Sequence, residues 1–166
     1  MSREQFIKIS RWFENRPQQR KILIISEKIS VLFFYAAYII LLAVLLAAAT
    51  PKFNKTLLVP AAVFLLGTLL RSALNRPRPY EVWQTKPLVP KNTAGKSFPS
   101  RHALSAAVIA AAWLWNYPTA ATAVLFGAML LIVAAVRVIA GVHFVKDVAF
   151  GIFFGGFLGY VGFWLL

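Results

Sequence analysis

The chain contains only two histidines, His102 and His143, and each lies in a short segment that also contains arginine. Asp147 follows His143 by four residues, a spacing that places both side chains on one face of a helix. A carboxylate in that position can hold the imidazole in one tautomer, which a nucleophilic or basic histidine requires. Asp147 is also the only acidic residue after Glu81. These placements predict an enzyme in which His143 and Asp147 act together.

Arginines accompany both histidines. Several guanidinium groups close together repel one another unless an anion lies among them, and their planar fork matches the oxygens of a phosphate. The helix expected to begin beside His102 has Ser100 in position to cap it, and the free N–H groups at a helix start also attract anions. The sequence therefore predicts a phosphate site. Its expected ligands are Arg71, Arg78, Ser100, Arg101 and Arg137.

The two histidines divide the chemistry of phosphate transfer between them. Because Asp147 can orient His143, we expect His143 to attack phosphorus and form a phosphohistidine, and His102 to protonate the departing oxygen. The arginines then stabilise charge on the equatorial oxygens of the transition state. We expect no metal and no cofactor. Two histidines and an aspartate can hold iron or zinc, but the surrounding arginines disfavour a cation.

Long uncharged segments must position these residues. Asp, Glu, Lys and Arg are absent from residues 31–50, 56–70, 103–136 and 148–166. About 20 apolar residues span the hydrocarbon core of a bilayer, so the third segment holds two spans, divided near Pro118. We predict an all-α, polytopic membrane helical bundle that forms a single domain over residues 1–166. Its five transmembrane helices are expected at about 29–50, 55–74, 100–117, 118–140 and 143–166.

The segments outside the spans are basic. Residues 1–28 alternate basic and apolar side chains and are expected to form an interfacial amphipathic helix, broken near Pro17. Residues 75–99 form a polar, proline-rich loop of the kind that often carries function. Five crossings bring every candidate residue from 71 to 147 to one membrane face. The net charge of +13 then reflects topology and an anionic ligand. Nucleic acid is a poor partner, because this charge lies between membrane spans.

These residues together resemble a known three-part signature. Arg71-x6-Arg78-Pro79, Pro99-Ser100-Arg101-His102 and Arg137-x5-His143-x3-Asp147 are similar to the motifs of the type 2 phosphatidic acid phosphatase superfamily. Its pattern is Lys-x6-Arg-Pro, Pro-Ser-Gly-His and Ser-Arg-x5-His-x3-Asp. The resemblance implies a metal-independent membrane phosphatase acting on lipid phosphates or diphosphates. It also implies the roles given above to the two histidines and Asp147, and phosphate binding by Arg71, Arg78, Ser100 and Arg137.

Three positions depart from this pattern. Arg71 replaces lysine, which keeps the charge but changes its reach, and Val136 replaces serine, which removes one phosphate contact. Arg101 replaces glycine and adds a cation, so we expect it to favour a more highly charged headgroup such as a lipid diphosphate. None of the three changes removes a group that performs a chemical step.

The leading hypothesis is hydrolysis of a lipid phosphate in the membrane. Undecaprenyl diphosphate, phosphatidylglycerophosphate and phosphatidic acid are the candidate substrates. A phosphotransferase with the same site is an alternative, because only its acceptor pocket would differ. A non-catalytic anion channel or lipid-binding protein fits less well, since the His143–Asp147 pair would have no function in it. The sequence leaves the oligomeric state open.

Two lines of reasoning predict opposite orientations of the chain in the membrane. Basic residues gather on the active-site face and at the N-terminus, and the positive-inside rule would place that face in the cytoplasm. Members of the superfamily usually act on the outer or lumenal face, and much of the charge here serves phosphate binding. We therefore expect an integral protein of the bacterial plasma membrane, with its active site on the extracytoplasmic face.

Overall fold

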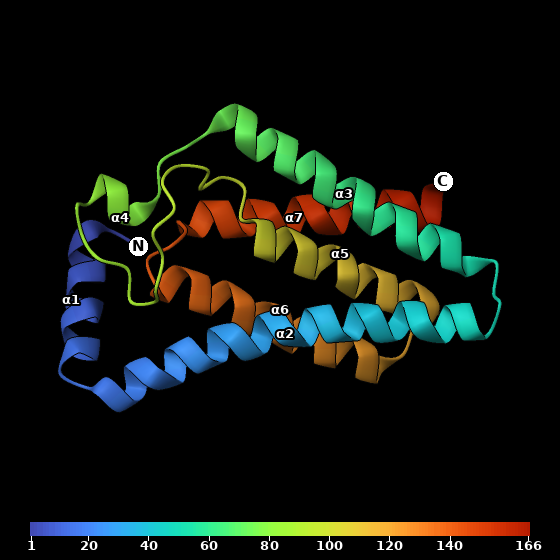
Figure 1. Ribbon diagram of the computed structural model, residues 1–166, viewed down its shortest axis with the longest axis horizontal. Helices are drawn as coiled ribbons and strands as arrows, with labels where there is room; N and C mark the ends of the chain where they lie inside the picture. Colours follow the sequence, from blue (N-terminus) through green and yellow to red (C-terminus); the bar gives the residue numbers. More distant parts are fainter.

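A computed structural model describes all 166 residues and shows a bundle of long helices with no strands (Figure 1). This confirms the predicted all-α class. The helices run over Arg3–Glu14 (α1), Pro17–Ala47 (α2), Lys52–Leu74 (α3), Pro79–Val82 (α4), Arg101–Asn116 (α5), Ala120–Ile139 (α6) and Val145–Tyr160 (α7), and Val161–Leu165 adds a π-helical turn (η1).

The N-terminal segment divides at Pro17, as predicted, but the residues after Pro17 belong to the first long helix and not to an interfacial helix. Residues from Pro17 onward begin α2 and do not continue the amphipathic helix. Proline suits the first position of a helix because its missing N–H and fixed φ cost nothing there. No helix breaker follows it, so α2 extends well before the predicted start at residue 29. The amphipathic helix is therefore α1 alone, which opens with a capping box between Ser2 and Gln5.

Four helices are long and apolar enough to cross a membrane, namely α2, α3, α6 and α7 with its π-helical turn. The fifth predicted span corresponds to α5, which has 16 residues and a length of about 24 Å. Its neighbours α3, α6 and α7 enclose it in the bundle (Figure 1). The central helix can therefore be shorter than the helices that face lipid.

Glycines bring α5 and α7 close together. A Cβ added at Gly155 would lie 2.3 Å from the carbonyl oxygen of Leu104, and one at Gly151 would lie 2.7 Å from the carbonyl oxygen of Ser100. Both distances are too short for any larger residue. The small-residue stripe of α7 therefore serves close helix packing, and it sets the start of α5 against the start of α7.

The chain's polar segments gather at one end of the bundle. Figure 1 shows α1, α4 and the loop that follows α4 at this end, together with the end of α6 and the starts of α5 and α7. The turns from α2 to α3 and from α5 to α6 lie at the opposite end, as does the C-terminus. This arrangement agrees with the topology expected from five crossings.

Candidate active site

His143 lies in the tight turn that joins α6 to α7 and is 2% exposed. Its backbone N–H donates to the carbonyl of Arg137 at 3.3 Å. The turn needs Gly141, which has a φ of +71°, a region that other residues rarely adopt. The ring of Phe6 from α1 also occupies the space that a Cβ of Gly141 would take. The amphipathic helix thus buttresses the turn that carries His143.

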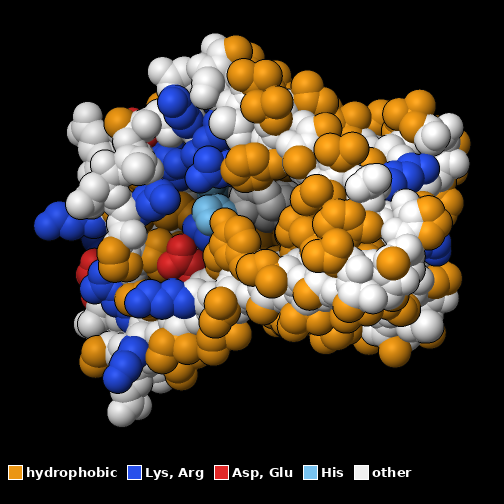
Figure 2. All heavy atoms as spheres, turned by 45° about the vertical axis from the view of Figure 1, so that its right-hand side comes forward, with side chains coloured by type: hydrophobic (Ala, Val, Ile, Leu, Met, Phe, Trp, Pro, Cys, Tyr) orange, Lys and Arg blue, Asp and Glu red, His pale blue; other side chains and the backbone are white.

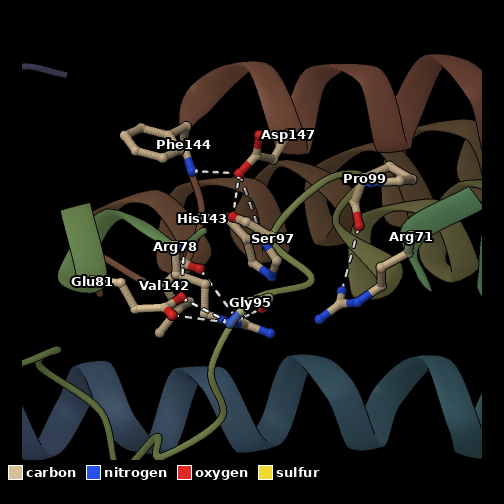
Figure 3. A network of polar contacts seen from close by, with 10 residues as sticks. All are labelled: Arg71, Arg78, Glu81, Gly95, Ser97, Pro99, Val142, His143, Phe144 and Asp147. Atoms are coloured by element: carbon tan, nitrogen blue, oxygen red, sulfur yellow. Dashed lines mark hydrogen bonds and ion pairs between the residues drawn. The ribbon is translucent and has the colours of Figure 1, made fainter. Parts of the chain in front are cut away.

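Asp147 lies one turn into α7 and is 1% exposed. Its Oδ2 accepts hydrogen bonds from the Ser97 hydroxyl at 2.5 Å and from the Phe144 N–H at 3.0 Å (Figure 3). The same oxygen lies 3.8 Å from Nδ1 of His143, which has no hydrogen-bond partner. At that distance the carboxylate attracts the imidazole without a formed hydrogen bond. The structure brings the predicted pair together and adds Ser97, which the sequence analysis missed.

The surroundings of His143 favour its neutral form. Burial lowers the pKa of His143 to about 4, and the nearby guanidinium groups of Arg78 and Arg71 act in the same direction. The Asp147 carboxylate opposes this shift without cancelling it. An unprotonated imidazole, which is the form that can act as a nucleophile, is therefore favoured at neutral pH.

Arg78 is fixed between two backbone carbonyls. Its Nε donates to Gly95 at 3.0 Å and its Nη1 donates to Val142 at 3.2 Å (Figure 3). Glu81 accepts from the backbone N–H groups of Arg78 and Gly95, at 2.8 and 2.9 Å. These bonds fold the loop after α4 back over the site. Because two of its donors are already engaged, the buried guanidinium of Arg78 has a fixed direction, and its remaining N–H groups are available to a ligand.

Three more cations approach the same place. Arg71 donates to the carbonyl of Pro99 at 3.4 Å. Arg137, at the end of α6, is 3% exposed and pairs with Glu27 of α2 at 2.9 Å. Lys91 comes from the loop after α4, and its pKa is lowered by burial and then by the neighbouring charges of Arg78 and Arg137. Lys91 and Glu27 lie in no recognisable motif and were not predicted from the sequence.

The start of α5 contributes two unpaired polar atoms. Ser100 is the N-cap residue by position, but its hydroxyl makes no capping hydrogen bond. Its N–H instead donates to the carbonyl of Asp147 at 2.9 Å. The Ser100 hydroxyl and Nδ1 of His102 are buried without a hydrogen-bond partner. Buried polar groups are normally paired, so these atoms are expected to meet a bound ligand.

Arg101 differs from the other predicted phosphate ligands in its surroundings. It is exposed, and its guanidinium lies 5.4 Å from the centre of the Phe64 ring. The side chain lines an apolar cavity beside His102 that the buried Arg78 and Arg137 do not line. Its assignment as a phosphate ligand stays a prediction.

An apolar groove leads from His102 into the bundle. It begins between Tyr35 of α2 and Phe64 of α3, with His102 and Arg101 at its polar end. A second cavity shares Tyr35 and Phe64 and continues along α3 to Leu57. Figure 2 shows the resulting hollow, with a histidine between basic side chains on one side and apolar side chains on the other. The site thus joins a cationic pocket to a hydrophobic channel.

The residues do not form a recognisable metal site. No three His, Asp or Glu side chains lie close enough together to hold a metal ion. The acids near the histidines are engaged elsewhere, since Asp147 accepts from Ser97 and Glu27 pairs with Arg137. The arrangement suits an anion that carries several oxygens.

Two solved structures share this fold. The first is a transmembrane PAP2-type phosphatidylglycerolphosphate phosphatase from Bacillus subtilis, with 22% identity and a TM-score of 0.64 over 95% of this chain and 90% of that one. The second is LpxE from Aquifex aeolicus, with 21% identity and a TM-score of 0.64 over 86% and 92%. A search of curated protein sequences gives no significant match.

The apolar helices and the membrane proteins that share the fold make this chain an integral membrane protein. The family model of the PAP2 superfamily matches residues 36–166, which include all three motifs. That match covers most of the chain, and the chain therefore belongs to the PAP2 superfamily.

Proposed function

We propose that this protein hydrolyses a lipid phosphate or diphosphate within the membrane through a phosphohistidine. One observation carries the proposal: the Ser100 N–H ties the buried His143–Asp147 pair to the start of α5, where His102 and Arg101 form the polar end of an apolar groove. A phosphate ester with a hydrocarbon tail complements both halves of that site. A soluble phosphate ester would leave the groove without an occupant.

In the proposed reaction each group has its own step. The neutral imidazole of His143 attacks phosphorus through the nitrogen that does not face Asp147, and the bond between phosphorus and the departing oxygen of the lipid breaks. The buried arginines hold the oxygens whose negative charge grows in the transition state. His102 donates a proton to the departing lipid oxygen and then takes one from the water that hydrolyses the phosphohistidine. The products are a dephosphorylated lipid and inorganic phosphate.

The proposal is tested by phosphate release from lipids of different headgroup. The purified protein in detergent and excess EDTA is given undecaprenyl diphosphate, phosphatidylglycerophosphate or phosphatidic acid. We expect turnover of at least one lipid, undiminished by EDTA, and much slower turnover of glycerol 3-phosphate, which has no tail for the groove. Loss of turnover on EDTA addition, or equal turnover of the tailless ester, would contradict the proposal. Transfer of phosphate to another alcohol without release would identify a phosphotransferase.

The low pKa of His143 predicts a particular pH dependence. The attacking imidazole must be unprotonated, and its pKa in the free enzyme is about 4, below the ordinary value near 6.5. The rate constant kcat/KM reports the free enzyme. It should therefore stay high as the pH falls through 6.5 and decline only nearer to pH 4. An acidic limb centred at or above pH 6.5 that does not coincide with the second ionisation of the substrate phosphate, at about pH 6, would show that His143 is less buried than the structure indicates.

We infer that the site faces the extracytoplasmic side of a bacterial plasma membrane. The chain has no cysteine, so a single introduced thiol can report orientation. Lys86 and Asn54 are both exposed; Lys86 lies in the loop after α4, and Asn54 lies in the first turn of α3 at the opposite end of the bundle. A membrane-impermeant maleimide added to intact cells should label Lys86→Cys and spare Asn54→Cys. The reverse pattern would place the active site in the cytoplasm.

A further inference from the structure

Glu27 connects a helix outside the three motifs to the phosphate site. It lies on α2, and its Oε1 accepts a hydrogen bond from Nη1 of Arg137 at 2.9 Å. The Arg137 side chain is 4% exposed and that of Glu27 is 21% exposed. This is the one hydrogen bond that the guanidinium of Arg137 makes. The contact joins residues that are 110 positions apart in the chain.

Arg137 needs a partner to remain where it is. Burying a guanidinium is costly unless an opposite charge and hydrogen bonds compensate for the lost water. The nearby cations Arg78 and Lys91 repel it further. Asp147 and Glu81 do not fill this role, because Asp147 accepts from Ser97 and Phe144, and Glu81 accepts from the loop backbone. The two acids of α1 are exposed and make no ion pair with Arg137. Glu27 is therefore the counter-ion that allows Arg137 to stay buried.

The contact leaves most of Arg137 free to bind a ligand. A guanidinium has five N–H donors, and Glu27 engages only Nη1 through one carboxylate oxygen. The same arginine accepts the backbone N–H of His143 at its carbonyl oxygen. Arg137 can therefore bind Glu27 and a phosphate together while it stays attached to the turn of the nucleophile.

From these contacts we propose that Glu27 is a positioning residue that holds the guanidinium of Arg137 toward the phosphate of the substrate. The inference rests on the proposed phosphatase function and extends the site to α2. The opposite possibility is competition, in which Glu27 occupies Arg137 and excludes phosphate. The two differ in sign: loss of a positioning group weakens phosphate binding, whereas loss of a competitor strengthens it.

The test compares Glu27→Gln, Glu27→Asp, Arg137→Gln and the double variant Glu27→Gln/Arg137→Gln. The measured quantities are kcat, KM and the inhibition constant of orthovanadate, a mimic of the transferred phosphate. We expect Glu27→Gln to lower kcat/KM on the order of tenfold or more and to weaken vanadate inhibition. Glu27→Asp keeps the charge and should recover part of the loss. With Arg137→Gln present, Glu27→Gln should have little further effect, because Glu27 acts through Arg137.

Glu14→Gln is the matched control, since Glu14 is an exposed carboxylate on α1 without an ion pair. It should leave all three quantities unchanged. Tighter vanadate inhibition in Glu27→Gln would overturn the proposal in favour of competition. The proposal would also be overturned if the losses of kcat/KM in the two single variants added fully in the double variant. The same holds if Glu27→Gln lowered the thermal stability in detergent and left the kinetic constants unchanged. If the unmodified protein releases no phosphate from any lipid, the proposed function itself fails, which separates that failure from one confined to Glu27.

Discussion

Replacing His143 with alanine is expected to lower phosphate release by about a thousandfold or more, because no other group can take over the attack on phosphorus. Asp147 is an anion already held by Ser97 and the backbone, and the nearby arginines are cations. The arginines should still bind the substrate. The loss should therefore fall on kcat, with KM changed much less.

The intermediate gives a second measurement of the same prediction. A lipid labelled with radioactive phosphate and quenched in alkali should leave label on the unmodified protein, as expected for a phosphohistidine, and none on His143→Ala. Val145→Ala alters an exposed neighbour in the same segment and serves as the control for folding and handling. Retention of a tenth of the activity by His143→Ala would contradict the assignment. Label that survives acid but not alkali would also do so, because it would indicate a hydroxyl nucleophile.

Local patterns were enough to predict most of the fold. Uncharged segments of membrane-spanning length give the long helices, and the ends of α3, α6 and α7 fall within a few residues of the predicted ends. The start of α2 was misplaced by 12 residues, 17 against the predicted 29, because the whole alternating segment 1–28 was assigned to an interfacial helix. The helix instead continues beyond the apolar segment, where Arg20 donates to the carbonyl of Leu88 in the active-site loop. Charge marks where a span leaves the bilayer and does not mark where the helix ends.

The candidate site was predictable where its contacts are local in sequence. His143 and Asp147 are four residues apart, so helical geometry brings them together. The pairs Ser97–Asp147 and Glu27–Arg137 are separated by 50 and 110 residues. Such contacts depend on how α2, α6 and α7 pack, and no periodicity in the sequence encodes that. The helix cap expected from the Ser100 hydroxyl does not form. The hydroxyl is unpaired, and the N–H of Ser100 donates to the carbonyl of Asp147.

Replacing His102 with alanine is expected to slow the enzyme by an amount that depends on the leaving group. An alkoxide departs poorly unless it is protonated, so kcat/KM for a lipid alkyl phosphate should fall about a hundredfold to ten-thousandfold. Para-nitrophenyl phosphate releases a phenolate that is stable without a proton, and its kcat/KM should fall far less. The comparison uses kcat/KM because this constant covers the steps up to the first irreversible one, which here is formation of the phosphohistidine.

Comparing the losses of kcat/KM in His143→Ala and His102→Ala for the two substrates distinguishes a proton donor from a residue that only shapes the site. His143→Ala should reduce both substrates to a similar extent, because the nucleophile is needed whatever group departs. His102 lies at the polar end of the groove, with Nδ1 buried and unpaired, and we expect it to meet the oxygen that joins phosphate to the lipid tail. If His102→Ala slows both substrates equally, His102 binds phosphate or supports the fold. The proton for the departing oxygen must then come from another donor, and Lys91, whose pKa is lowered by burial and by the neighbouring cations, is a candidate.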